Sequence, residues 1–113
     1  MKEIKAIIRP FKLLDVSEAL KEIEGLPGVT VSEIKGFGKS RAAGAKDKVV
    51  FEMVEFIPRL QLEVVVEDKM VDAVVDAIQK SAHTGNTGDG KIFVVNVEDV
   101  VKIRTNERGQ AAI

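Results

Sequence analysis

Residues 4–23, IKAIIRPFKLLDVSEALKEI, change from a strand pattern to a helix pattern at Pro10. Before Pro10, Ile4, Ala6 and Ile8 recur at the two-residue period of a strand that buries one face. Beyond it, apolar residues recur at the period of an amphipathic helix; they are Leu13, Val16, Ala19, Leu20 and Ile23. Because Gly25, Pro27 and Gly28 then break this pattern, the stretch predicts a strand over residues 4–9 and a helix over residues 11–26.

The same two patterns continue along the chain and predict the remaining elements. Alternating or β-branched runs predict strands over residues 29–34, 60–66 and 91–97, with a short extension over 101–104. Asp68 fits the N-cap of a second helix, whose apolar face runs from Val71 to about Ala82. The order β-α-β-β-α-β predicts an α+β, ferredoxin-like fold: a four-stranded antiparallel sheet with two helices on one face, in a single domain over residues 1–113.

Composition excludes several kinds of function. The 113 residues carry a formal net charge of −1, so no overall field would hold the chain on nucleic acid or anionic lipid. The absence of Cys excludes disulfides and Cys-ligated zinc, and the single His excludes two-His metal motifs. No stretch approaches the ~18 apolar residues of a membrane span, and the charged start of the chain does not resemble a secretory signal, so we expect a cytoplasmic protein.

The clearest chemical signal is the stretch Thr84–Lys91, TGNTGDGK. Glycines at this spacing let backbone N–H groups converge on an anion, and the lysine adds a positive charge, so the stretch predicts a phosphate site. It is not a Walker A loop, because Ile92 stands where Ser or Thr is required and the predicted order is helix, loop, strand. A plain glycine turn between helix and strand is the alternative.

Two other groups of cations could serve the same anion. Lys102 and Arg104 flank Ile103, so the two-residue period of a strand would send both to one face; a solvated charged edge is the alternative. The second group lies in residues 36–55, a long loop whose first half has no apolar period, begins GFGK and contains Lys39, Arg41, Lys46 and Lys48. A basic loop of this length can contact a partner or be ordered by a ligand, and an idle solvated loop is the alternative.

Several segments, in the right order, resemble the P-II nitrogen-regulatory signal proteins. Thr84–Val94 (TGNTGDGKIFV) is similar to the family's B-loop, over about residues 83–91, and Ile7–Leu13 (IIRPFKL) to its first strand and helix start. Lys35–Gly38 (KGFG) resembles the base of its T-loop, a flexible loop over about residues 37–55, and residues 101–113 resemble its C-terminal segment. The resemblance covers nearly the whole chain and implies a signalling protein rather than an enzyme.

The family's assembly and ligands follow from the resemblance as expectations. It implies a homotrimer that binds ATP or ADP in three intersubunit clefts, with 2-oxoglutarate beside Mg-ATP, and whose T-loops contact transporters, enzymes or regulators. The apolar runs Val64–Val66 and Val94–Val95 independently favour an oligomer, because they carry more apolar surface than two helices can cover. Nucleic acid is not an expected partner, and a membrane would be met only through a transporter.

The resemblance also implies roles for individual residues. The phosphates would be held by Gly88, Asp89, Gly90 and Lys91, with Lys39, Lys102 and Arg104 as further cations. The adenine and ribose would be lined by Thr30, Gly36, Gly38 and Val65. No protein ligand to the Mg²⁺ that accompanies ATP is assigned.

Departures from the family pattern change what is expected. The chain has no Tyr, so the tyrosine modification of some members is impossible. Ser40 stands where the family's Gln supplies an oxygen to Mg²⁺, while Arg59 keeps a cation for the effector's carboxylate, so we expect weak binding of 2-oxoglutarate or none. Lys48 stands where many members carry an Arg that plugs an ammonium channel. A divergent regulator of a bicarbonate or metal transporter is therefore an alternative to a regulator of nitrogen metabolism.

Two other classes of function have less support from the residues. An RNA-recognition module with this fold needs exposed aromatic residues on its sheet, and Phe93 is nearly the only candidate. A small acid–base enzyme could use Asp89 or Glu63 with Lys91, but the sequence gives these groups no paired geometry, and it gives His83 no partner.

Overall fold

The structure, a computed structural model, describes residues 1–37 and 56–113. Its strands are β1 (Lys2–Ile8), β2 (Thr30–Gly36), β3 (Ile57–Val66) and β4 (Lys91–Asn96), and its α-helices are α1 (Leu13–Lys21) and α4 (Val71–Ala82). Short 3₁₀ turns precede the two helices, η1 (Pro10–Lys12) and η2 (Asp68–Met70), and a third, η3 (Gly109–Ala112), lies near the chain end. None of the helices in these two ranges is long and apolar enough to cross a membrane.

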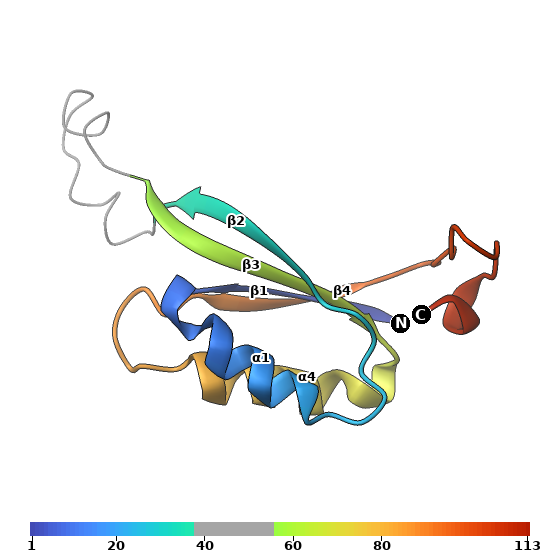
Figure 1. The fold of residues 1–113 in the computed structure, drawn as a ribbon, viewed down its shortest axis with the longest axis horizontal. Helices are drawn as coiled ribbons and strands as arrows, with labels where there is room; N and C mark the ends of the chain where they lie inside the picture. Colours follow the sequence, from blue (N-terminus) through green and yellow to red (C-terminus); the bar gives the residue numbers. More distant parts are fainter. Residues whose placement is uncertain (38–55) are drawn as a thin grey trace.

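The four strands form one antiparallel sheet in the order β2-β3-β1-β4. Both helices lie against the same face of this sheet, side by side (Figure 1). This arrangement confirms the predicted ferredoxin-like fold. It leaves β2 and β4 as the edge strands and gives the sheet a second face without helices, called the open face below.

The core is the layer between the sheet and the two helices. Alternate residues of β1 from Ile4 and of β3 from Leu60 are buried there, as the two-residue period requires, and so is one apolar face of each helix. Its members are Ile4, Ala6, Ile8, Leu60, Leu62, Val64 and Val66 from the strands, and Val16, Leu20, Val74, Ile78 and Ala82 from the helices. The core residues of the two central strands are thus the ones that the two-residue sequence pattern identifies.

The open face shows apolar side chains to solvent. The pairing register places Phe93 opposite Lys5 and Val95 opposite Glu3, so both lie on the face that the buried residues of β1 do not use. Six large apolar residues of the edge strands and the C-terminal segment have exposed fractions from 43% to 99%; these are Val31, Phe93, Val94, Val95, Val101 and Ile103. A single chain therefore leaves much apolar surface uncovered at its edges.

Some predicted boundaries are wrong for identifiable reasons. The first helix ends at Lys21 instead of continuing to residue 26, because the next residues form tight turns and Gly25 adopts a positive φ of 77°. β3 begins at Ile57 although Pro58 follows. Pairing with β1 starts only at Leu60, so β2 is the sole neighbour at Pro58 and one side of β3 is an edge there, where proline is tolerated.

Asp68 does not cap the second helix. It lies at the start of η2, whose preceding residue makes no side-chain cap, and α4 begins only at Val71. The carboxylate of Asp68 instead accepts a hydrogen bond from the Met1 ammonium group at 2.9 Å, and this bond lowers the pKa of Asp68. The residue therefore fastens the start of β1 to the segment between β3 and α4.

Residues 101–104 are not a strand extension. Val101 forms an isolated bridge with Arg108, and between them the chain turns through Asn106, which has a φ of 61°. The backbone N–H of Lys102 donates to Glu107, and its carbonyl accepts from Asn106. Lys102 and Arg104 therefore lie on a turn that projects from the body of the sheet, so the two-residue period does not place them on one face.

Candidate phosphate-binding loop

The residues between α4 and β4 form a tight loop over the end of β1, called the glycine loop here (residues 83–90). Gly85, Gly88 and Gly90 have φ values of 91°, 99° and 107°, a region that glycine adopts at little cost. A Cβ at Gly90 would overlap the carbonyl oxygen of Ile7, so the loop backbone lies directly against β1 at this point. The glycines are therefore required by backbone conformation and by close approach, as an anion-binding nest would require.

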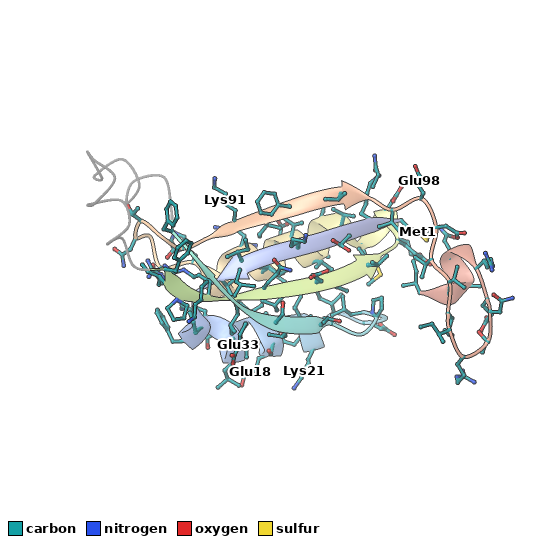
Figure 2. The ribbon with its side chains drawn as sticks, turned by 90° about the horizontal axis from the view of Figure 1, so that it is seen from above. Met1, Glu18, Lys21, Glu33, Lys91 and Glu98 are labelled. Carbon is teal, nitrogen blue, oxygen red and sulfur yellow. The ribbon has the colours of Figure 1, made fainter. Side chains whose placement is uncertain are left out.

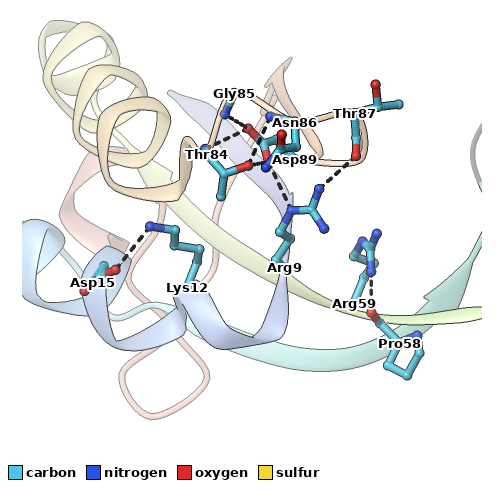
Figure 3. A network of polar contacts seen from close by, with 10 residues as sticks. All are labelled: Arg9, Lys12, Asp15, Pro58, Arg59, Thr84, Gly85, Asn86, Thr87 and Asp89. Carbon is cyan, nitrogen blue, oxygen red and sulfur yellow. Dashed lines mark hydrogen bonds and ion pairs between the residues drawn. The ribbon is translucent and has the colours of Figure 1, made fainter.

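Asp89 is the centre of a hydrogen-bond network inside the glycine loop (Figure 3). One of its carboxylate oxygens accepts from the backbone N–H groups of Thr84 at 2.8 Å and Gly85 at 2.9 Å. The other accepts from the Thr84 hydroxyl and, at 3.0 Å, from Nε of Arg9. These bonds, above all that of the Thr84 hydroxyl, hold the pKa of the Asp89 carboxyl far below its ordinary value of 3.8. With four donors, the carboxylate has used its acceptor capacity.

Two arginines that lie far apart in the sequence meet at the glycine loop. Arg9 follows β1 and also donates from Nη2 to the carbonyl of Thr87 at 2.8 Å. Arg59 lies on β3, and its Nη1 donates to the carbonyl of Pro58 at 2.9 Å. Each guanidinium has Nη2 3.3 Å from the position that a Cβ would take at Gly88. Lys91, the first residue of β4, follows the loop directly and is a third basic residue beside it.

Arg9 is the site residue that sequence reasoning missed. It looked like the last residue of a strand before a proline, and it stands 80 positions from Asp89. The signal that could have identified Arg9 is the antiparallel register of β1 and β3. Ile8 pairs with Leu60, so the next position along the same register places Arg9 beside Arg59. That register cannot be read from the sequence without knowing which strands pair.

A small cleft of about 220 Å³ lies beside the glycine loop. It is lined by Ile8, Ile78 and Ile92 together with His83, Gly90 and Lys91, among others, and is thus mainly apolar. Sites for drug-sized ligands usually have about 300–1,000 Å³, so this cleft alone is small for a nucleotide. In the part of the chain that the structure describes, no group of three or more His, Asp or Glu side chains is arranged to hold a metal ion.

The structure does not bring all the predicted nucleotide residues together in one chain. Gly36 pairs with Ile57 at the end of the sheet near Arg59, and Lys91 pairs with Ile7 at that same end. Val65 pairs with Glu3, which precedes Ile7 in β1 by four residues, or about 13 Å, and so lies toward the other end of the sheet. Thr30 begins the edge strand β2, three strand spacings or about 14 Å across the sheet from β4.

Lys102 and Arg104 lie beyond the opposite end of the sheet from the glycine loop. Figure 2 shows Lys91 at one end of β4 and Glu98 beside Met1 at the other, from where the C-terminal segment continues away. Lys102 is 3.8 Å from Glu107 of its own segment. Gly38, Lys39 and the effector residue Ser40 lie outside the described residues, as do the loop residues Arg41, Lys46 and Lys48.

The network at Asp89 predicts a pH dependence of stability. Because folding lowers the pKa of this carboxyl, its contribution is complete above the ordinary value of 3.8 and is lost as the pH falls toward the lower folded value. We expect Asp89→Asn to lower the free energy of unfolding at pH 7, and this difference from the parent protein to shrink below about pH 4. Denaturant unfolding at several pH values would measure this. Asp76→Asn, which changes an exposed carboxylate on α4, is the control; an Asp89→Asn deficit that stays constant down to pH 2 would contradict the assignment.

Comparison with known proteins adds independent findings to this geometry. The family model described as nitrogen regulatory protein P-II matches residues 1–107. The chain is 51% identical to a nitrogen regulatory protein P-II of Azospirillum brasilense and 50% identical to nitrogen regulatory protein P-II 1 of Escherichia coli K12, in each case over 113 residues and the full length of both chains. The structure resembles that of Arabidopsis thaliana PII bound to citrate, with a TM-score of 0.80 and 39% identity, covering 99% of this chain and 91% of that one.

These matches cover more than half of the chain by family model and the whole of it by pairwise identity, and the structural match agrees with the fold described above. The chain belongs to the nitrogen regulatory protein P-II family of signal transduction proteins.

Proposed function

We propose that this signal protein binds ATP and ADP at the glycine loop, in three clefts between the subunits of a homotrimer. The observation that carries the proposal is the loop itself: three glycines at positive φ, with Arg9, Arg59 and Lys91 around them. Backbone N–H groups in such a nest, combined with nearby cations, are suited to the oxygens of a polyphosphate. Gly88 would let the phosphates approach the backbone beside the two arginines, Gly90 would hold the loop against β1, and Lys91 would add a charge-assisted hydrogen bond.

Asp89 would serve this site through its conformational role. Its carboxylate already accepts four hydrogen bonds, and a negative charge would repel phosphate. We therefore assign Asp89 to holding the loop, and assign the phosphates to the backbone and to Lys91. Mg²⁺ would arrive with ATP and neutralise part of the phosphate charge.

The separation of the site residues supports an intersubunit cleft. Thr30, Lys102 and Arg104 lie far from the glycine loop of their own chain, so they would reach the nucleotide bound at the loop of a neighbouring subunit. The exposed apolar residues of β4 and of the C-terminal segment, with Ile103 99% exposed, supply surface that such an assembly would bury. A cyclic trimer uses two different patches of each subunit at every interface, which matches a site in two halves.

The signal would leave the site through residues 37–55. Gly36, at the end of β2, lies at the same end of the sheet as the glycine loop, so occupancy of the loop can be sensed where residues 37–55 begin. We propose that they contact a transporter or enzyme of nitrogen metabolism. The proposed role is regulatory and includes no catalysed reaction.

For the effector, we propose that 2-oxoglutarate binds weakly or not at all. Arg59 places a guanidinium beside Gly88 and could pair with a carboxylate, but Ser40 is shorter than the Gln of related proteins and lacks its reach to Mg²⁺. The ratio of ATP to ADP would then be the main signal.

The nucleotide assignment is tested by Lys91→Ala. Loss of a charge-assisted hydrogen bond costs about 1.5–3 kcal/mol, so we expect the Kd for ATP and for ADP to rise by about 10- to 150-fold in calorimetric titrations. Lys69→Ala removes an exposed lysine that pairs with Glu67 near the opposite end of the sheet and should leave both affinities unchanged. Equal nucleotide affinity in Lys91→Ala and the parent protein would refute the site.

The effector assignment is tested by titrating 2-oxoglutarate into the Mg-ATP complex of the parent protein and of Ser40→Gln. We expect little or no heat from the parent and measurable binding by the variant, because the longer side chain restores an oxygen ligand for Mg²⁺. Micromolar binding by the parent, with no gain in Ser40→Gln, would show that Ser40 does not limit the effector.

A further inference from the structure

Arg9 makes two contacts that tie the glycine loop to the sheet. Its Nε donates to Asp89 at 3.0 Å and its Nη2 to the carbonyl of Thr87 at 2.8 Å, so one planar group holds two points of the loop. Of the four donors to the Asp89 carboxylate, three come from the loop itself and only Arg9 comes from another element. The side chain is 20% exposed, which shields these contacts partly from water.

The charge of Arg9 is already matched within the network. Asp89 lies against its Nε with a carboxylate that is 23% exposed, so the pair contributes little net charge at the loop. Arg59 and Lys91 have no carboxylate within ion-pair distance among residues 1–37 and 56–113, and they are the cations that would attract an anion. The contribution of Arg9 must therefore come mainly from geometry.

We infer that Arg9 is a positioning residue of the nucleotide site, which holds the glycine loop in its phosphate-binding shape before any nucleotide arrives. The inference rests on the proposed nucleotide function and assigns the preorganisation of that site to one side chain just beyond the end of β1. Through Asp89 it fixes Thr84 and Gly85 at the start of the loop, and through Thr87 it fixes the peptide that leads into Gly88. A loop fixed in advance binds more tightly because less conformational entropy is lost on binding.

Lysine cannot replace this arginine fully. An ammonium group is a point charge, whereas the guanidinium donates from two nitrogens in a fixed plane. Arg9→Lys keeps the charge but carries all its donors on one nitrogen, so it cannot reproduce the geometry in which two nitrogens of Arg9 contact Asp89 and Thr87. The variant therefore separates an effect of charge from an effect of geometry.

The test combines amide hydrogen exchange of the nucleotide-free protein with calorimetric titration of ATP, for the parent, Arg9→Met and Arg9→Lys. Lys12→Met is the matched control: Lys12 is also 20% exposed and also forms an ion pair, but with Asp15, away from the loop. In Arg9→Met we expect about tenfold faster exchange at the amides of Thr84 and Gly85 and at least about tenfold weaker ATP binding, since hydrogen bonds to charged groups are worth that much. Arg9→Lys should show a smaller loss in both, and Lys12→Met none.

Two results would overturn the inference. If Arg9→Met weakens ATP binding while exchange at Thr84 and Gly85 stays as in the parent, Arg9 contacts the nucleotide directly and does not position the loop. If exchange rises while ATP affinity stays unchanged, the loop shape does not govern binding. A parent protein that binds no ATP would contradict the proposed function itself, and the exchange rates of the same variants would still decide whether Arg9 holds the loop.

Discussion

The close approach of Gly90 to the carbonyl of Ile7 is the contact on which the site depends. It brings the backbone of the glycine loop onto the end of β1, so that β4 can start immediately afterwards and pair with β1 from Lys91 onward. The same contact lets Arg9, just beyond β1, reach Asp89 and Thr87. The point where β4 begins to pair with β1 and the position of the loop beside Arg9 thus depend on one tight backbone contact, which only glycine permits.

A single chain leaves apolar surface of the sheet and of the C-terminal segment exposed. The helices bury a single face of the sheet, and apolar side chains of β4 and the C-terminal turn remain in solvent. Residues of the predicted nucleotide site lie partly at the glycine loop and partly beyond the far end of the sheet. The proposed cyclic assembly would account for both facts, because it would bury the apolar edges and join the two halves of the site across each interface.

The sequence was sufficient for the order and type of the four paired strands and the two α-helices, because each has a recognisable apolar pattern. The glycine-dependent loop at Thr84–Lys91 could also be predicted, because closely spaced glycines favour such backbone turns, and phosphate binding there stays a proposal. Arg9 could not be recognised, because its role depends on which strands pair and in which register. The prediction of a strand over 101–104 was wrong for a related reason. The chain turns at Asn106, and the local alternation of apolar residues cannot reveal that turn.

The central claim is that each nucleotide site combines the glycine loop of one subunit with the C-terminal segment of the next. The most direct measurement is the ATP affinity of a mixed oligomer. Lys91→Ala and Arg104→Ala chains with different tags are co-expressed, and ATP is titrated into the purified mixed oligomer. Each variant alone should bind weakly, whereas random mixing should restore parent-like affinity at about a quarter of the clefts, where an intact loop meets an intact C-terminal segment. No recovery of tight sites in the mixed oligomer would contradict a site shared between subunits.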